Sequence, residues 1–182
     1  MTSFIDTFTL FQVSDGSIRI NDGSFVILGS GGSSIREFNR LSFVQGQIAT
    51  IVSNTLLIRN VIVKIIYTLV PGNIINLSNQ LIGFELKSTI TNRTNSITLT
   101  LRDKAGKFST VEKRQALGII SFVPSDFVNI DLSNIVVIEY VIRSFDLNSN
   151  QILPFLSLGP VFLNQIGGGS GGSGGSINKC GY

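Results

Sequence analysis

The stretch LLIRNVIVKIIYTLV, residues 56–70, decides the fold class, because apolar residues fill most positions on both faces of an extended chain. One face would carry Val61, Val63, Ile65, Tyr67 and Leu69, and the other Ile62, Lys64, Ile66 and Thr68. A strand that is apolar on both faces lies in the middle of a sheet. The stretch therefore predicts one long central strand, or two strands with a bulge near Asn60, and Pro71-Gly72-Asn73 ends it.

Two later segments also have the two-residue period of a strand. In SITLTLR, residues 96–102, the predicted core positions are Ile97, Leu99 and Leu101, and the predicted solvent positions are Thr98, Thr100 and Arg102. In IVVIEYVI, residues 135–142, Val136, Ile138, Tyr140 and Ile142 would face the core, with Val137, Glu139 and Val141 facing outward. Both segments therefore predict strands that direct one face toward the core.

Turn residues separate these strands from many shorter ones. Asp15-Gly16 and Asp22-Gly23 lie between apolar runs and predict a meander in the first thirty residues. Further strands are predicted over 35–44, 47–53, 81–91, 107–113 and 118–123, with a loop at 29–34 and a single helical turn at 125–128. Pro154 and Pro160 predict short or edge strands between residues 151 and 163. No amphipathic helix of three turns is apparent, so the sequence predicts an all-β, antiparallel two-sheet β-sandwich of jelly-roll type.

Composition narrows the function. The chain has 182 residues, of which 43% are hydrophobic and 14% charged, and its formal net charge is +3. It contains no His, no Trp and one Cys, so the commonest general base and a CxxC metal site are missing. Its basic residues are scattered and not interleaved with aromatic residues, which argues against nucleic acid as a partner. The N-terminus shows no secretory signal, and residues 56–70 are too short and too interrupted to span a membrane. We expect no cofactor and no catalysis.

Acidic and amide side chains suggest few sites. Asp126, Asn129 and Asp131 form an oxygen-rich group that could hold calcium, although no D-x-D-x-D-G spacing is present. Glu85 and Glu139 lie inside predicted strands and could face a cleft, but outward charge on a two-faced strand is the better explanation of both. The sequence therefore assigns no catalytic residue and only this one candidate metal site.

The C-terminus differs in composition from the rest of the chain. Residues 1–166 would form the sandwich, residues 167–176 are only Gly and Ser, and residues 177–182 contain Cys180 and Tyr182. A Gly/Ser segment behaves as a flexible linker. An exposed thiol at the end of such a linker is suited to an intermolecular crosslink or contact, so Cys180 and Tyr182 are predicted to join copies of the chain or to attach cargo.

Three segments resemble a known class of domain. They are VILGSGGSSIRE (26–37), TLRDKAGK (100–107) and SDFVNIDLSNIVVIEYVI (125–142). Together they are similar to secreted bacterial jelly-roll domains of carbohydrate-binding-module type. The resemblance implies a β-sandwich without catalytic activity.

Two functions remain open at this stage. The first is a structural protein whose copies self-associate into a filament, coat, capsid or surface layer at a cell, spore or virion surface, since sparsely charged strands invite pairing between copies. The second is a module that binds carbohydrate or protein, for which Tyr67, Tyr140 and the Phe residues could supply the contact surface. We expect the partners to be other copies of the chain, with a glycan or protein as the alternative.

Overall fold

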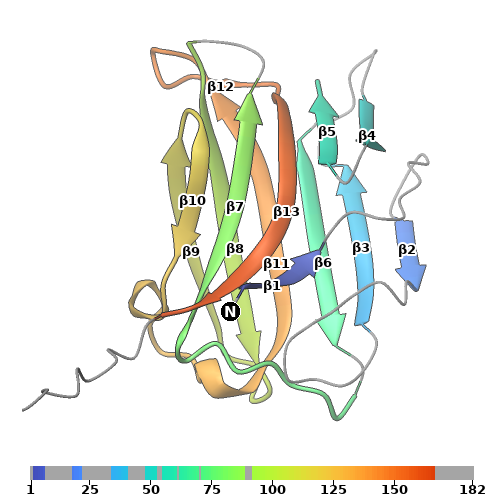
Figure 1. Ribbon diagram of the computed structural model, residues 1–182, viewed down its shortest axis with the longest axis vertical. Helices are drawn as coiled ribbons and strands as arrows, with labels where there is room; N and C mark the ends of the chain where they lie inside the picture. Colours follow the sequence, from blue (N-terminus) through green and yellow to red (C-terminus); the bar gives the residue numbers. More distant parts are fainter. Residues whose placement is uncertain are drawn as a thin grey trace, which may run out of the picture.

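A computed structural model describes residues 2–6, 18–21, 34–40, 48–52, 55–60, 62–69, 71–88 and 92–166 of the chain. Within these ranges the regular elements are β-strands and two short 3-10 helices (Figure 1). The strands form two antiparallel sheets that pack face to face, which confirms the predicted all-β sandwich. Consecutive strands repeatedly cross from one sheet to the other, an arrangement typical of a jelly roll.

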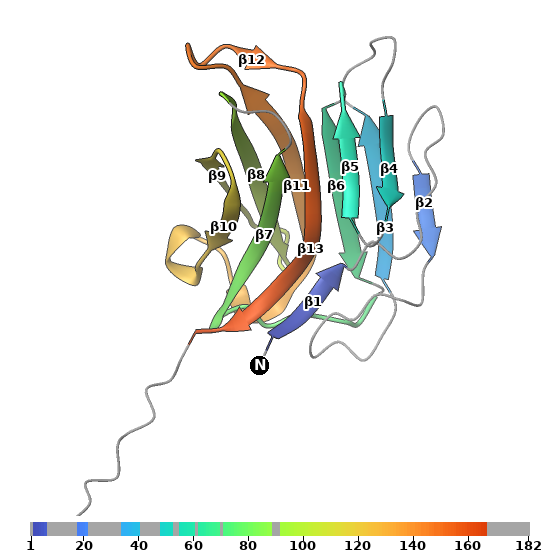
Figure 2. The ribbon, with the colours of Figure 1, turned by 45° about the horizontal axis from the view of Figure 1, so that its top comes forward.

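The front sheet has the strand order β10-β7-β13-β5-β4. Its strands are β4 (Ile48–Val52), β5 (Thr55–Arg59), β7 (Gln80–Ser88), β10 (Gly118–Phe122) and β13 (Phe155–Gln165), with β1 (Thr2–Asp6) as a sixth. On the side of β13 away from β7, β5 pairs with its first half and β1 with its second half. Figure 2 shows β5 and β1 at the two ends of β13.

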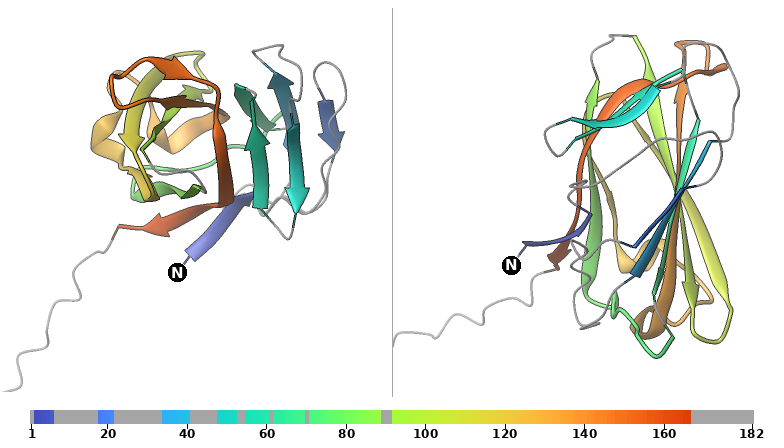
Figure 3. Two further views of the ribbon diagram at one scale, coloured as in Figure 1. Left: turned by 90° about the horizontal axis from the view of Figure 1, so that it is seen from above. Right: turned by 90° about the vertical axis from the view of Figure 1, so that its right-hand side faces the viewer.

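The back sheet has the order β2-β3-β6-β11-β8-β9, and β12 pairs with the end of β11. Its strands are β2 (Ile18–Asn21), β3 (Ser34–Arg40), β6 (Val63–Leu69), β8 (Thr94–Asp103), β9 (Phe108–Gln115), β11 (Ile135–Phe145) and β12 (Gln151–Ile152). The 3-10 helices η1 (Pro124–Asp126) and η2 (Leu132–Asn134) lie between β10 and β11. The right-hand view in Figure 3 shows the two sheets edge-on.

The stretch 56–70 is divided between the two sheets. It ends β5 in the front sheet at Arg59 and begins β6 in the back sheet at Val63, so the two-strand interpretation is the right one, with a change of sheet in place of a bulge. Asn60 stands at the crossing with a φ of 55°, and its N–H donates to the Pro154 carbonyl at 2.7 Å. Asn tolerates this left-handed backbone because its short polar side chain bonds locally.

Replacing Asn60 tests this account of the crossing. We expect Asn60→Val to lower the free energy of unfolding by about 1–2 kcal/mol, because a β-branched residue is strained at positive φ. Asn60→Gly keeps that conformation accessible and serves as the control. Urea unfolding monitored by circular dichroism would give both values, and equal midpoints for the two variants would contradict the account.

The core lies between the sheets and follows the predicted alternation except in β11. There Ile135 is buried in place of Val136, because the pairing of β11 with β8 shifts between Ile135 and Val137, and Val141, which was predicted to face outward, is also buried. Val63, Ile65, Tyr67 and Leu69 of β6 are buried, as are Ile97, Leu99 and Leu101 of β8 and Ile138, Tyr140 and Ile142 of β11. The core residues of the front sheet are Leu56 and Ile58 of β5, Ile82, Phe84 and Leu86 of β7, Ile120 and Phe122 of β10, and Leu156, Leu158, Val161 and Leu163 of β13. The alternation of each strand therefore leaves a second set of side chains on the outer face of its sheet.

The prediction of short or edge strands around the two prolines is right for β12, which has two residues, and wrong for β13. β13 is eleven residues long and lies between β7 and the pair β5 and β1, in the middle of the front sheet. Pro160 is tolerated there because the pairing with β7 shifts between Leu158 and Val161, so the missing N–H falls in an irregularity of the ladder.

Several of the sequence predictions concern residues outside the described ranges. The apolar runs 7–13 and 24–28 and the linker 167–176 lie outside the described residues. The predicted loop at 29–34 also lies outside them, apart from Ser34, which begins β3. The predicted helical turn at 125–128 corresponds to η1, one residue earlier. In the part of the chain that is described, no helix is long and apolar enough to cross a membrane.

Candidate functional site

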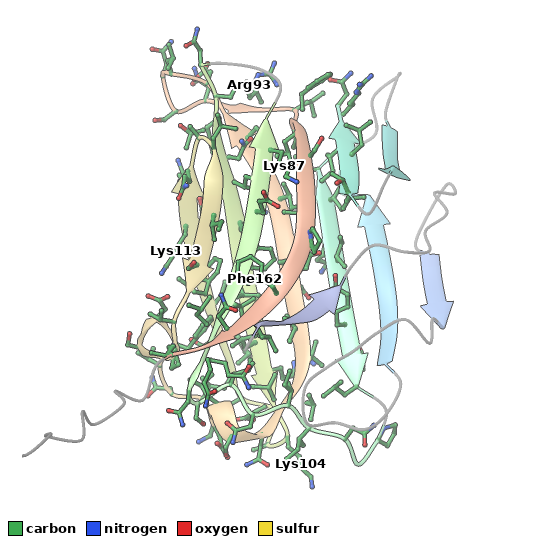
Figure 4. All side chains as sticks on the ribbon, viewed as in Figure 1. Lys87, Arg93, Lys104, Lys113 and Phe162 are labelled. Carbon is green, nitrogen blue, oxygen red and sulfur yellow. The ribbon has the colours of Figure 1, made fainter. Side chains whose placement is uncertain are left out.

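The outer side of the front sheet carries an aromatic ring among polar groups (Figure 4). We call the outward side chains of β5, β7, β10 and β13 the front face. It comprises Leu57 and Arg59 of β5, Leu81, Gly83, Glu85 and Lys87 of β7, Ile119 and Ser121 of β10, and Phe155, Ser157, Gly159, Phe162 and Asn164 of β13. These positions alternate with core residues on each strand, apart from the irregularity before Val161.

Phe162 lies over the backbone of the neighbouring strand. Its residue partner across the ladder is Gly83 of β7, and a Cβ atom built on Gly83 would overlap the Phe162 ring. Glycine at position 83 therefore lets the ring lie on the sheet, instead of standing away from it. Ser121 of β10 pairs with Gly83 on its other side, so the ring and a hydroxyl-bearing residue lie in one row across the sheet. Phe162 is partly exposed in this position.

A second glycine makes room for a carboxylate. A Cβ atom on Gly159 would lie 2.6 Å from Oε2 of Glu85, so this side chain rests over the glycine. Lys87 Nζ lies 3.3 Å from the same oxygen, and the two side chains are 54% and 40% exposed. An ion pair this exposed contributes little to stability, so both groups can exchange it for other partners at small cost.

Arg59 and Phe155 form the other end of the front face. The two residues are opposite each other in the β5–β13 ladder, and the Arg59 guanidinium carbon lies 4.9 Å from the centre of the Phe155 ring. Nε of Arg59 is out of contact with solvent and has no hydrogen-bond partner. The cation is therefore positioned by the aromatic ring beneath it.

A hollow lies where β7 begins and β13 ends, beside η1. Its volume is about 660 Å³, and it is lined by Ser78, Asn79, Val123, Pro124, Ser125, Gln165 and Ile166. Asn79 and Ile166 are joined by a backbone hydrogen bond of 2.9 Å, so the two strand ends are held together at its rim. The hollow is open and lies at the end of the sheet nearer to Phe162.

The outer side of the back sheet is different, because several of its polar groups bond one another. Lys64 pairs with Glu139 at 3.3 Å, Arg143 donates to Thr98 at 3.1 Å, and the Thr100 and Thr110 hydroxyls are 2.8 Å apart. Arg114 pairs with Glu112 and stacks over Phe145, with 3.8 Å between its guanidinium carbon and the ring centre. The Lys64–Glu139 pair is 29% and 28% exposed, so its charges are less open to exchange with a ligand than those of the Glu85–Lys87 pair on the front face. The front face is therefore the better candidate site.

The residues suggested for calcium have separate roles. Asp126 pairs with Lys113 at 2.6 Å and accepts from the Val123 N–H at 2.8 Å. Asp131 accepts hydrogen bonds from Ser133 and Asn134 in η2, and these bonds lower its pKa below the usual 3.8. Asn129 has a φ of 59° in the turn between them. In the described ranges, no three His, Cys, Asp or Glu side chains are close enough to hold a metal ion.

The structure also shows the positions of Glu85, Glu139, Tyr67 and Tyr140, the other described residues that the sequence suggested. Glu85 and Glu139 lie on the outer faces of different sheets, each beside a lysine, and are not brought together. The proposal that Tyr67 and Tyr140 form a contact surface is wrong, because both are buried in the core, where their hydroxyl oxygens are 2.9 Å apart. Cys180 and Tyr182 lie outside the described residues.

Sequence reasoning missed the residues that shape the front face. Phe162 and Gly83 are separated by most of the second half of the chain, and only strand pairing shows that they are neighbours. One signal was present: an isolated glycine within a strand pattern, as in LIGFELKS, indicates close approach of another group.

Comparison with known proteins gives weak structural likenesses alone. No family model matches the sequence, and no curated protein matches it. The chain resembles the family 11 carbohydrate-binding module of the cellulosomal cellulase Lic26A-Cel5E of Clostridium thermocellum, with a TM-score of 0.43, 13% identity, and coverage of 91% of this chain and 95% of that chain. It also resembles the structure of PfGH50B, with a TM-score of 0.45, 16% identity, and coverage of 70% of this chain and 22% of that chain.

A third likeness is to the agarase AgWH50C, with a TM-score of 0.44, 13% identity, and coverage of 90% of this chain and 24% of that chain. The chain thus spans about a quarter or less of the length of PfGH50B and AgWH50C. The resemblance to carbohydrate-binding-module sandwiches noted in the sequence is accompanied by a weak structural one. At TM-scores this low, the likenesses identify neither a family nor a ligand for this chain.

Proposed function

We propose that the protein is a non-catalytic carbohydrate-binding β-sandwich and that its front face is the binding surface. The observation that carries the proposal is the partly exposed Phe162 ring lying over Gly83, with polar side chains beside it. The face of an aromatic ring carries negative charge density. The C–H groups on one side of a sugar ring carry a small positive charge and form a flat apolar surface, so the two stack well.

The surroundings of Phe162 supply the polar part of such a site. Ser121 lies in the same row across the sheet, Asn164 follows two residues along β13, and Glu85 and Lys87 lie further along β7. Hydroxyl, amide and charged groups provide the donors and acceptors that orient a ligand rich in hydroxyls. An apolar platform with a few polar groups around it is the usual composition of a binding site.

This reading is better supported than assembly into a filament, coat, capsid or surface layer. The assembly hypothesis rested on sparse charge and on the C-terminal segment with Cys180, which lies outside the described residues. The binding hypothesis has a defined aromatic platform at Phe162, although the platform differs from the tyrosines suggested by the sequence.

The test is affinity electrophoresis of the purified chain in gels that contain a soluble polysaccharide, with mixed-linkage β-1,3-1,4-glucan and polygalacturonate as first probes. We expect retardation by at least one polysaccharide. Phe162→Ala should weaken that binding by about tenfold, which corresponds to about 1.4 kcal/mol of lost contact. Gly83→Ala should also weaken it, because the added Cβ would push the Phe162 ring off the sheet.

The matched control is Phe108→Ala, which removes a ring that is 66% exposed on β9 of the back sheet. We expect that variant to bind as the unaltered chain does. Absence of binding to a broad set of neutral and acidic polysaccharides, or equal binding by the Phe162 and Phe108 variants, would refute the proposal. Urea unfolding of each variant shows whether lost binding reflects a lost fold.

A further inference from the structure

The Arg59 guanidinium is an unusual group on the front face. It lies 4.9 Å from the Phe155 ring centre, and its Nε is out of contact with solvent without a hydrogen-bond partner. Among the described residues no carboxylate forms an ion pair with it. This one N–H donor of the partly exposed side chain has given up hydration without gaining an acceptor, which is costly for a charged group.

Three other arginines have hydrogen-bond partners within the described part of the chain, whereas the exposed Arg102 has none. Arg93 donates to the Leu153 carbonyl at 3.0 Å, Arg143 to the Thr98 hydroxyl, and Arg114 to the Glu112 carboxylate at 2.7 Å. Arg114 also stacks on a ring, as Arg59 does, but it has a carboxylate partner as well. Arg59 has the ring without the carboxylate. Among the described residues Arg59 therefore has no anionic partner, and its guanidinium is available to the anion of a ligand.

The charged side chains near Arg59 also favour an anionic ligand. Lys87 lies opposite Ser157 in the ladder, and Arg59 lies opposite Phe155, two residues away on the same strand. Both cations are therefore on the same end of the front face, on either side of β13. Among the described side chains of the front face, Glu85 is the one carboxylate, and it is already paired with Lys87. The local charge is positive, which favours an anionic ligand.

We propose that the front face binds an anionic polysaccharide, a chain that carries carboxylate or sulfate groups, with an acidic group at Arg59 and a sugar ring on Phe162. This inference rests on the proposed carbohydrate-binding function and adds the class of glycan. Phe155 and Phe162 are seven positions apart on β13, which corresponds to about 23 Å at about 3.3 Å per residue. A polymer of several sugar units can therefore reach both ends at once.

The chemistry of arginine explains the preference. A guanidinium stacked on an aromatic ring keeps its planar N–H groups directed sideways, where a carboxylate or sulfate can accept two of them. Lys87 adds a second positive charge nearby and can leave its exposed partner Glu85 for a ligand anion. Binding should therefore weaken as salt is raised, because partly exposed charges are screened.

The experiment compares the full chain with two variants that lose the same charge. Arg59→Gln removes one of the two cations of the front face, and Arg102→Gln removes an exposed cation from β8 on the outer side of the back sheet. The probes are polygalacturonate, dextran sulfate, neutral mixed-linkage glucan and single-stranded DNA, each at low and at physiological salt. Polygalacturonate and dextran sulfate separate a carboxylate from a sulfate preference.

We expect the unaltered chain to bind at least one anionic polysaccharide tenfold or more tightly than the neutral glucan. Arg59→Gln should lose about tenfold of that affinity, whereas Arg102→Gln should lose less than twofold. If Arg59→Gln unfolds, Arg59→Lys keeps the charge but not the planar fork, and it should still bind less tightly than the unaltered chain.

The possible failures are distinguishable. Binding of neutral glucan as tight as that of the anionic polymers, or equal losses in the two Gln variants, would overturn the inference and leave the carbohydrate-binding function standing. Binding of single-stranded DNA as tight as that of the acidic polysaccharides would also overturn it, because the face would then recognise charge alone. Absence of binding to every polysaccharide would overturn both proposals.

Discussion

Phe84→Ala is expected to lower the free energy of unfolding by about 3–5 kcal/mol, the usual cost of removing a buried phenylalanine ring. Phe84 is completely buried on the inner side of β7. Its ring meets the edges of two other aromatic rings, with its centre 4.9 Å from that of Tyr140 and 5.7 Å from that of Phe122. Tyr140 belongs to the back sheet, so the substitution removes a contact that joins the two layers.

Urea unfolding followed by far-ultraviolet circular dichroism measures this loss as a lower midpoint at constant slope. Phe108→Ala, the variant used as a binding control, removes the same side chain from an exposed position and should change the free energy by less than about 0.5 kcal/mol. If Phe84→Ala leaves too little folded protein to measure, Phe84→Leu keeps most of the volume and should cost about 1.5 kcal/mol. Equal midpoints for the Phe84 and Phe108 variants would contradict the described packing.

Asp103→Ala is expected to cost about 3 kcal/mol, because it removes two hydrogen bonds to a charged acceptor. The Asp103 residue is 2% exposed at the end of β8. One carboxylate oxygen accepts from the Lys107 N–H at 2.9 Å, and the other from the Asp131 N–H at 3.1 Å. The side chain thus ties the β8–β9 turn to the segment that precedes η2, and its loss leaves both N–H groups without this acceptor.

Asp103→Asn provides a graded comparison, since an amide keeps one acceptor oxygen of nearly the same shape. We expect it to lose about half as much as Asp103→Ala in the same urea experiment. Glu112→Ala, which removes an exposed carboxylate from β9, should change stability by less than about 0.5 kcal/mol. A loss from Asp103→Ala no larger than that from Glu112→Ala would show that the two backbone bonds are replaced by water.

Much of the fold could be predicted from local patterns. The alternation in SITLTLR, and that of Ile138, Tyr140 and Ile142 in IVVIEYVI, places the right side chains in the core, because a strand directs successive residues to opposite sides. The strand predicted over 107–113 corresponds to β9, and Gly106, at a φ of 83°, makes the turn between β8 and β9. Each of these features depends on residues that are close together in the chain.

The predictions that depended on neighbours in space were less successful. The sequence left open whether 56–70 is one strand or two, because apolar residues on both faces fit a central strand in either case. The pattern around Pro154 and Pro160 indicated an edge, yet β13 lies in the middle of the front sheet. A proline excludes a hydrogen bond at one position, and the structure met that requirement with a local shift in pairing.

The candidate site shows the same limit. The sequence suggested Tyr67 and Tyr140 as a contact surface. Strand pairing instead directs both toward the core, where a hydrogen bond joins their hydroxyl groups. Phe162 and Arg59 carry no sequence motif. They form the proposed binding surface because Gly83 makes room for the Phe162 ring and the Arg59 guanidinium lies over the Phe155 ring.

By itself, the sequence determined that this protein is an all-β sandwich, which side of several strands is buried, and which catalytic groups the chain lacks. These properties follow from composition and from the period of two along a strand, which are local. The tertiary structure alone decided that residues 56–70 change sheets at Asn60, that β13 is central, and that Arg59 and Phe162 share a face. Those outcomes depend on which strands pair, and pairing is decided by how the whole set of apolar faces can be buried together.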